Sequence, residues 1–161
     1  MKRLLLDTNI YGYIVADNDR DNVHAWIHTN DKISLYGFEV IRKELRSTKR
    51  NVCGLRMDLL RIYDDFVKKT YGVEDAMNEL AEEYYNTYLE LGGNRPKDKL
   101  MNDFLIIACS SLKDLDIVVS NDENTMLNEL QIRAYRLTNK NKGVRLPSFI
   151  NYDKFKNVIK K

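Results

Sequence analysis

Apolar residues open the chain in a short run that ends at a carboxylate. The segment at 3–7 contains three consecutive leucines and stops at Asp7. A continuous apolar run bounded by polar residues is typical of a parallel strand that is covered on both faces. A second run of this kind, at 116–122, also ends in an acid, Asp122. The sequence therefore predicts two buried strands, each followed by a carboxylate.

Between these strands, apolar residues recur every three to four positions, which indicates amphipathic helices. The two longest such segments lie at 54–70 and 74–91. The other expected elements are strands at 32–37 and 131–139, and helices at 9–16, 21–29, 38–48, 102–112 and 151–161. Strands that alternate with helices favour an α/β fold around a mostly parallel sheet. In such sheets ligands bind beyond the carboxyl ends of the strands, where Asp7 and Asp122 are expected to lie.

The composition is that of a folded protein and is consistent with the predicted α/β fold. No repeat, low-complexity tract or Pro/Gly linker divides the 161 residues, so we expect a single domain, 1–161. No apolar stretch approaches the ~20 residues of a membrane span, which predicts a cytoplasmic protein without a membrane partner. The net charge of +2 is too small to predict nucleic-acid binding from bulk charge. A polyanion would need a local basic patch or a bound cation.

Two further acids stand out by their position. Asp103 opens the apolar helix expected at 102–112, and Glu44 lies late in the helix expected at 38–48. Four carboxylates at one rim would repel each other and raise each other's pKa unless a cation lies among them. Hard cations such as Mg²⁺ bind oxygen ligands, activate water and neutralise a scissile phosphate. Such a cluster supports hydrolysis of a phosphodiester without a histidine or a cysteine.

Each acid alone also has an ordinary structural interpretation. Asp7 and Asp103 suit the first turn of a helix, Asp122 suits a turn, and Glu44 suits a solvated helix face. Glu39 competes with Glu44 for the site in the same helix. The metal-site interpretation is stronger because all four acids occur together, each with a flanking apolar pattern.

Four segments resemble, in order, the motifs of PIN-domain ribonucleases, most closely the VapC-type toxins of prokaryotic toxin–antitoxin pairs: "LLLDTNI", "RKELRS", "NDFLIIACSSL" and "VVSND". The resemblance covers residues 3 to about 140. It implies a three-layer α/β/α sandwich, Mg²⁺ or Mn²⁺ as cofactor, and cleavage of single-stranded RNA that leaves a 5′-phosphate. It also implies a homodimer and an antitoxin protein as a candidate partner.

The resemblance assigns roles to individual residues. It implies four catalytic, metal-binding acids: Asp7, Glu44, Asp103 and Asp122. Leu45 follows Glu44 in the family's manner, which favours Glu44 over Glu39. Thr8 and Asn9 would hold the first acid or a metal-bound water, and Ser120 takes the place of a hydroxyl residue near the fourth acid. Candidate contacts to the RNA backbone are Arg46, Lys49 and Arg50.

Alternatives remain for the fourth motif and for the function. Asn121, Glu123 and Asn124 are further polar candidates beside Asp122, and the segment 54–100 is longer than compact toxins need. A haloacid-dehalogenase-like phosphatase would require a second aspartate where Asn9 stands. A catalytically degenerate PIN fold could instead bind RNA or serve in an assembly, and a housekeeping RNA-processing nuclease would carry the same acids.

For two other features we prefer a structural role to a functional one. His24 and His28 stand four residues apart, as a zinc pair would, but neither a third ligand nor a general base accompanies them. Tyr84, Tyr85 and Tyr88 could stack on bases, although neighbouring glutamates disfavour RNA contact, so we expect them to pack in the protein.

Overall fold

The central sheet is parallel throughout. The structure is a computed structural model that describes residues 1–48 and 53–160. Within these residues, five strands pair in the order β3-β2-β1-β4-β5. They are β1 (Lys2–Leu6), β2 (Ile33–Phe38), β3 (Val67–Tyr71), β4 (Ile117–Val119) and β5 (Ser148–Ile150). Because β1 and β4 are neighbours, the residues that follow them meet at one edge of the sheet.

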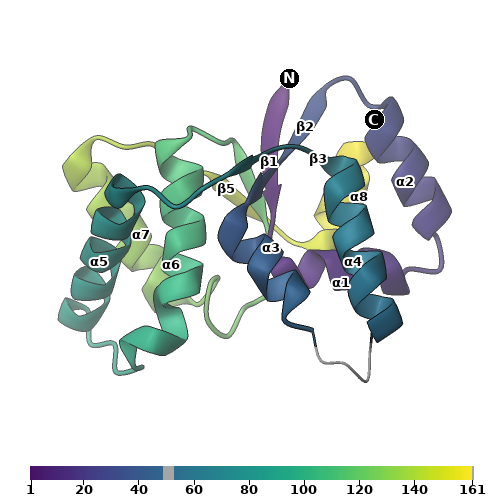
Figure 1. Cartoon of the computed structure of the whole chain (residues 1–161). Coiled ribbons are helices and arrows are strands. Elements are labelled where there is room, and N and C mark those ends of the chain that lie inside the picture. Colours follow the sequence, from purple (N-terminus) through teal and green to yellow (C-terminus); the bar gives the residue numbers. More distant parts are fainter. Residues whose placement is uncertain (49–52, 161) are drawn as a thin grey trace.

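Helices cover both faces of this sheet and make the expected three-layer α/β/α sandwich (Figure 1). On one side lie α5 (Asp75–Glu90), α6 (Lys97–Leu112) and α7 (Glu129–Lys142). On the other side lie α1 (Thr8–Ala16), α2 (Arg20–Thr29), α4 (Cys53–Phe66) and α8 (Tyr152–Ile159). The short helix α3 (Glu39–Arg46) contacts both α4 and α6 and so links the two layers. None of the described helices is long and apolar enough to cross a membrane.

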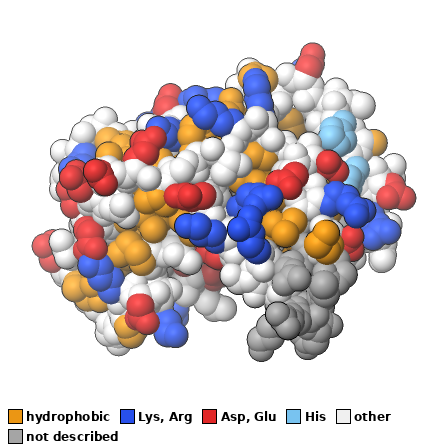
Figure 2. All heavy atoms as spheres, viewed as in Figure 1, with side chains coloured by type: hydrophobic (Ala, Val, Ile, Leu, Met, Phe, Trp, Pro, Cys, Tyr) orange, Lys and Arg blue, Asp and Glu red, His pale blue; other side chains and the backbone are white. Residues whose placement is uncertain are grey.

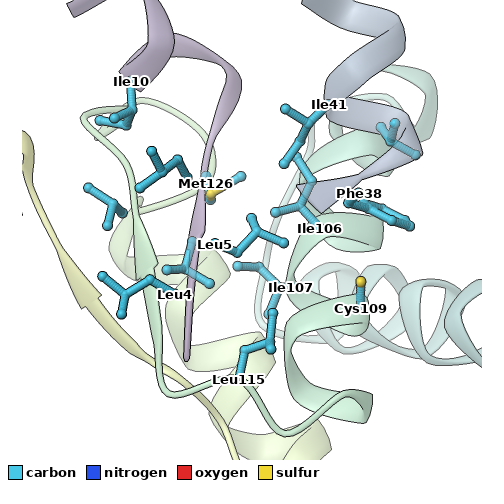
Figure 3. Close-up of a cluster of buried hydrophobic side chains, with 14 of the residues drawn as sticks. Leu4, Leu5, Ile10, Phe38, Ile41, Ile106, Ile107, Cys109, Leu115 and Met126 are labelled. Carbon is cyan, nitrogen blue, oxygen red and sulfur yellow. The ribbon is translucent and has the colours of Figure 1, made fainter. Parts of the chain in front are cut away.

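The leucines of β1 form the centre of the hydrophobic core. Leu4, Leu5 and Leu6 are all fully buried, because strands pair with β1 on both sides and helices cover both faces. In Figure 3, Leu5 points toward Ile106 and Ile107 of α6, whereas Leu4 points to the opposite face of the strand. Each buried leucine contributes about 1.5–3 kcal/mol relative to an exposed one.

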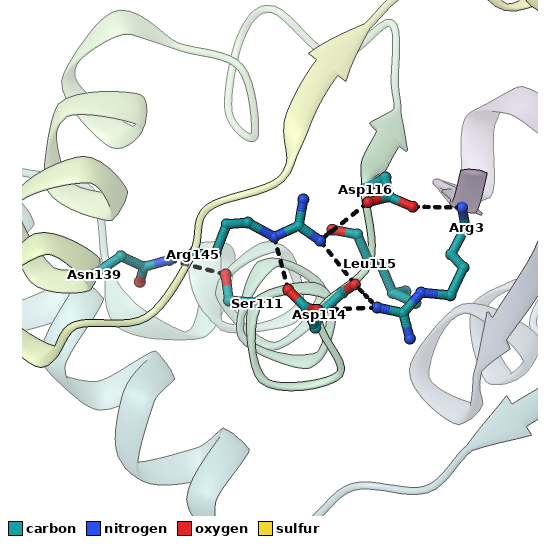
Figure 4. A network of polar contacts seen from close by, with 7 residues as sticks. All are labelled: Arg3, Ser111, Asp114, Leu115, Asp116, Asn139 and Arg145. Carbon is teal, nitrogen blue, oxygen red and sulfur yellow. Dashed lines mark hydrogen bonds and ion pairs between the residues drawn. The ribbon is translucent and has the colours of Figure 1, made fainter. Parts of the chain in front are cut away.

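The amino-terminal edge of the sheet is held by an ion-pair network (Figure 4). Asp114 adopts φ 55° between α6 and β4, and its carboxylate pairs with Arg3 and Arg145. Asp116 accepts a hydrogen bond of 2.7 Å from the backbone N–H of Arg3 and pairs with Arg145 at 3.1 Å. The network joins β1 to β4 at the end of the sheet opposite to the acids.

One predicted strand is wrong, because residues 131–139 form the middle of α7. The buried positions of this segment, at Gln131, Ala134, Tyr135 and Thr138, recur with helical spacing. Asn128 caps the helix through a hydrogen bond from the N–H of Leu130. The last strand is instead β5, which has only three residues and carries little periodic signal.

The helix predicted at 54–70 is also partly wrong, because it gives way at Phe66 to strand β3. The apolar spacing of α4 runs directly into Val67, so no polar break marks the change. Lys68 and Lys69 are exposed on this edge strand, where charged side chains discourage pairing with other chains. The other predicted elements agree with the structure to within a few residues, except that α6 begins five residues before 102.

Candidate active site

Asp7 lies at the carboxyl end of β1 and is also the N-cap of α1. Its Oδ1 accepts a hydrogen bond of 2.7 Å from the N–H of Thr8, and its Oδ2 accepts one of 2.7 Å from the hydroxyl of Ser120. The side chain is only 6% exposed. The cap role and a place at the rim of the sheet are therefore both true of this residue. Its backbone N–H donates to the carbonyl of Val119, which brings the ends of β1 and β4 together.

Glu44 of α3 reaches the same rim. Its Oε2 accepts a hydrogen bond of 2.7 Å from the hydroxyl of Thr8, and its Oε1 accepts one of 3.1 Å from the amide of Asn102 on α6. Glu39 does not share these partners, since it accepts a hydrogen bond of 2.6 Å from the N–H of Val73. The contact with Thr8 connects Glu44, rather than Glu39, to the first motif.

Asp122 lies in the loop between β4 and α7. Its Oδ1 accepts hydrogen bonds from the N–H groups of Asn124, at 3.1 Å, and Thr125, at 2.9 Å. Its Oδ2 accepts a hydrogen bond of 2.5 Å from the Thr125 hydroxyl. The backbone N–H of Asp122 donates to the hydroxyl of Ser120, which itself donates to Asp7. Ser120 therefore joins the first and the fourth acid.

Asp103 is the most strongly perturbed of the four acids. Because α6 begins at Lys97, Asp103 lies in its second turn and does not act as a helix cap. Its pKa is raised from 3.8 to about 7, chiefly because the carboxyl is buried; the Thr125 hydroxyl lowers the pKa, and the charges of Asp7, Asp122 and Glu44 raise it. Asp103 follows Asn102, whose amide donates to Glu44, so α6 adjoins the segment that carries the second acid.

Asp7 is perturbed in the same direction. Its pKa is raised to about 6, chiefly by burial; the hydrogen bonds from Ser120 and Thr8 lower the pKa, and the charges of Glu44 and Asp122 raise it. Buried carboxylates with raised pKa values are penalised in their charged form, and a bound cation would remove that penalty. The oxygen-only character of these groups fits Mg²⁺ or Mn²⁺.

The acids are not arranged as a ready coordination sphere. Among the described residues, no three His, Cys, Asp or Glu side chains lie close enough together to hold a metal ion. Both carboxylate oxygens of Asp7, Glu44 and Asp122 accept hydrogen bonds from protein donors. An ionised carboxylate has about four acceptor sites, so Glu44 and Asp122 could each bind a cation while keeping these protein donors.

The remaining predicted residues divide into three groups. Thr8 and Ser120 contact the acids, and the Oδ1 of Asn9 is buried without a hydrogen-bond partner in the described part of the chain. Arg46 is exposed on α3. Lys49 and Arg50 lie outside the described residues. Sequence reasoning missed the contacts of Asn102 and Thr125 with the acids. In the sequence, these contacts are indicated only by position: Asn102 precedes Asp103, and Thr125 follows shortly after Asp122.

The histidines of α2 and the tyrosines of α5 make packing contacts in the structure. His24 and His28 pack edge-on against the ring of Phe66, with centroid distances of 4.7 and 5.4 Å. Tyr84 and Tyr88 are buried, and both rings contact Phe104 of α6, so the packing prediction is confirmed for them.

Neither a protein-family profile nor any curated protein matches the sequence. Similar solved structures do exist. VapBC2 from Rickettsia felis bound to a promoter DNA fragment is 12% identical, with 92% of this chain and 98% of that chain covered and a TM-score of 0.57. VapBC-1 from nontypeable Haemophilus influenzae is 12% identical, with coverage of 94% and 98% and a TM-score of 0.57. VapBC-5 from Mycobacterium tuberculosis is 20% identical, with coverage of 76% and 86% and a TM-score of 0.50. This chain therefore shares its fold with these VapBC structures over most of its length.

Proposed function

We propose that this protein is a metal-dependent endoribonuclease that hydrolyses single-stranded RNA. The observation that supports the proposal is the set of hydrogen bonds that connects the acid-bearing segments: Ser120 bonds to Asp7 and to the backbone of Asp122, and Glu44 accepts from Thr8 and from Asn102, the residue before Asp103. Burial and mutual repulsion give two of these acids raised pKa values, which is typical of functional carboxylates. The VapC-like fold supports the same function by analogy.

The proposed cofactor is Mg²⁺ or Mn²⁺, with Asp7, Asp103 and Asp122 as its ligands. When bound, the ion would activate a water molecule and neutralise charge on the scissile phosphate. Glu44 would orient that water or support a second ion, since Thr8 and Asn102 fix both of its oxygens at the rim. Ser120 would keep Asp7 oriented toward the cation through its hydrogen bond to Oδ2.

RNA would approach over a surface of mixed charge. On the face shown in Figure 2, Lys and Arg side chains are interspersed with Asp and Glu side chains. Binding of the phosphate backbone would therefore depend on single cations near the acids, of which the exposed Arg46 is one. Phosphate contacts of this kind hold a strand without selecting its sequence.

The proposed biological role is that of a toxin in a cytoplasmic toxin–antitoxin pair. The similar solved structures are VapBC complexes, whose fold this chain shares over most of its length. We therefore propose an antitoxin protein as a partner and a homodimer as the assembled form. Co-expression with the product of a neighbouring small gene, followed by size-exclusion chromatography, tests both the antitoxin and the homodimer. A monomer that forms no complex would contradict this role. The proposal of nuclease activity would be unaffected by that result.

The nuclease activity is tested by cleavage of a mixed single-stranded RNA in the presence of Mg²⁺ or Mn²⁺. The native protein is compared with Asp103→Asn, and Asp98→Asn serves as the control because Asp98 is exposed in the first turn of the same helix. We expect cleavage by the native protein and by the control, and none by Asp103→Asn or after chelation. Equal cleavage by all three proteins would indicate contamination and contradict the proposal.

A further inference from the structure

Thr125 holds both oxygens of the fourth acid. Its backbone N–H donates to Oδ1 of Asp122 at 2.9 Å, and its hydroxyl donates to Oδ2 at 2.5 Å. The carboxylate therefore cannot rotate without losing at least one of these bonds. Hydrogen bonds to an ionised acceptor are roughly twice as strong as neutral ones, so this pair of contacts fixes the orientation of Asp122.

The same hydroxyl lowers the pKa of Asp103, which comes from α6 on a separate part of the chain, against the raising effect of burial. A threonine hydroxyl has one hydrogen and two acceptor lone pairs, so it donates to only one carboxylate at a time. The hydrogen bond that the structure shows goes to Oδ2 of Asp122. Thr125 is thus a link between the third and the fourth motif.

The loop around Thr125 is anchored on both sides. Met126 is fully buried in the core, and its carbonyl accepts a hydrogen bond of 3.1 Å from the hydroxyl of Tyr135 on α7. The N–H of Leu127 donates to the carbonyl of Asp122 at 2.8 Å. The place of the Thr125 hydroxyl is therefore set by packing and by backbone hydrogen bonds.

The neighbouring polar residues have other positions or partners. Asn121 accepts a hydrogen bond of 2.8 Å from the N–H of Tyr152 and so ties the loop to α8. The side chains of Glu123 and Asn124 are exposed. Among the loop residues after Asp122, Thr125 is the one whose side chain donates to the fourth acid.

We propose that Thr125 is a positioning residue of the candidate active site, whose hydroxyl sets the orientation of Asp122 relative to Asp103 and thereby the affinity for the divalent cation. This inference rests on the proposed function, since it concerns the same metal site. Residues that orient metal ligands typically change metal affinity or activity by 10–100-fold when they are removed.

The test compares Thr125→Val, which keeps the shape and the backbone N–H but removes the hydroxyl, with Thr125→Ser, which retains the hydroxyl. Binding of Mn²⁺ is measured by isothermal titration calorimetry, and thermal unfolding is followed without metal. We expect Thr125→Val to weaken Mn²⁺ binding by about 10-fold or more and Thr125→Ser to stay within about 3-fold of the native protein. Only folded protein enters the comparison, and Thr125→Ala replaces Thr125→Val if the valine variant does not fold.

A purely structural role would lower the unfolding temperature of Thr125→Val but leave the Mn²⁺ affinity of the folded protein unchanged, and this result would overturn the inference. Asp122→Asn provides the reference for loss of a ligand. If the native protein binds Mn²⁺ and cleaves RNA while Thr125→Val behaves identically, only the inference about Thr125 fails. If the native protein binds no Mn²⁺ at all, the proposed function fails together with it.

Discussion

The hydroxyl of Thr8 donates a hydrogen bond of 2.7 Å to Oε2 of Glu44, a residue 36 positions away in the chain. Thr8 is the first residue of α1, directly after the acid that caps this helix. One short segment therefore begins a helix, places Asp7 at the rim and holds a second acid from α3. This contact explains why a threonine follows the aspartate at the end of β1.

Removal of the Thr8 hydroxyl should free one oxygen of Glu44 from its hydrogen bond and leave every proposed metal ligand in place. We expect Thr8→Val to lower the rate of RNA cleavage by about 10-fold or more and Thr8→Ser to restore most of it. Thr29→Val is a suitable control, because the hydroxyl of Thr29 bonds only to the carbonyl of Ala25 in its own helix. Equal rates for Thr8→Val and the control would show that the contact has no part in catalysis.

The metal-free protein should lose stability as the pH rises, because the pKa of Asp103 is raised by folding from 3.8 to about 7. Below about pH 4 the carboxyl is protonated in both the folded and the unfolded chain. Between about pH 4 and pH 7 the unfolded chain releases this proton while the folded chain keeps it, so the free energy of unfolding falls. Asp7 acts in the same sense up to about pH 6. Thermal unfolding from pH 4 to 8 in the presence of a chelator measures the slope.

Asp103→Asn should remove part of this loss, because asparagine cannot ionise. At pH 7.5 without divalent cations, we expect this variant to raise the free energy of unfolding by about 1–3 kcal/mol, after allowance for solvent screening of a half-buried group. Urea denaturation provides the measurement. A destabilised Asp103→Asn under these conditions would mean that the ionised Asp103 carboxylate is not penalised in the folded protein, which contradicts its raised pKa.

Arg46 should contribute to RNA binding through the phosphate backbone. We expect Arg46→Ala to weaken binding of single-stranded RNA about equally for different sequences and to reduce its dependence on salt. Arg20→Ala is the control, since Arg20 begins α2 on the layer away from α6. Fluorescence anisotropy at several salt concentrations distinguishes the two variants, and an unchanged salt dependence in Arg46→Ala would exclude a direct phosphate contact.

The end of α7 provides a test of the segment that the sequence misassigned. Gly143 follows this helix with φ 67°, in the left-handed region that favours glycine, and its N–H bonds to the carbonyl of Lys140. We expect Gly143→Ala to cost about 1 kcal/mol of stability, because a Cβ is disfavoured in that conformation. Urea denaturation checks this value. A neutral or stabilising effect would argue that the chain does not leave the helix as described.

The sequence predicts the parts of the site that depend on local pattern. The apolar runs before Asp7 and Asp122 place both acids at strand ends, because continuous burial leaves a clear signal. The edge strands β3 and β5 escaped prediction, because the apolar spacing of α4 continues into β3 and because β5 has only three residues. The contacts of Thr125 and Asn102 were equally hidden, because they arise only when the loop after β4 and helix α6 come together in three dimensions.

The central claim is that Asp7, Asp103 and Asp122 hold a divalent cation at the rim of the sheet. The most direct test is a crystal structure of the protein grown with Mn²⁺, in which anomalous scattering locates the ion independently of any assay. We predict a manganese peak within coordination distance of carboxylate oxygens of Asp7, Asp103 and Asp122. No peak at the rim at saturating Mn²⁺, or a peak held only by other residues, would contradict the account.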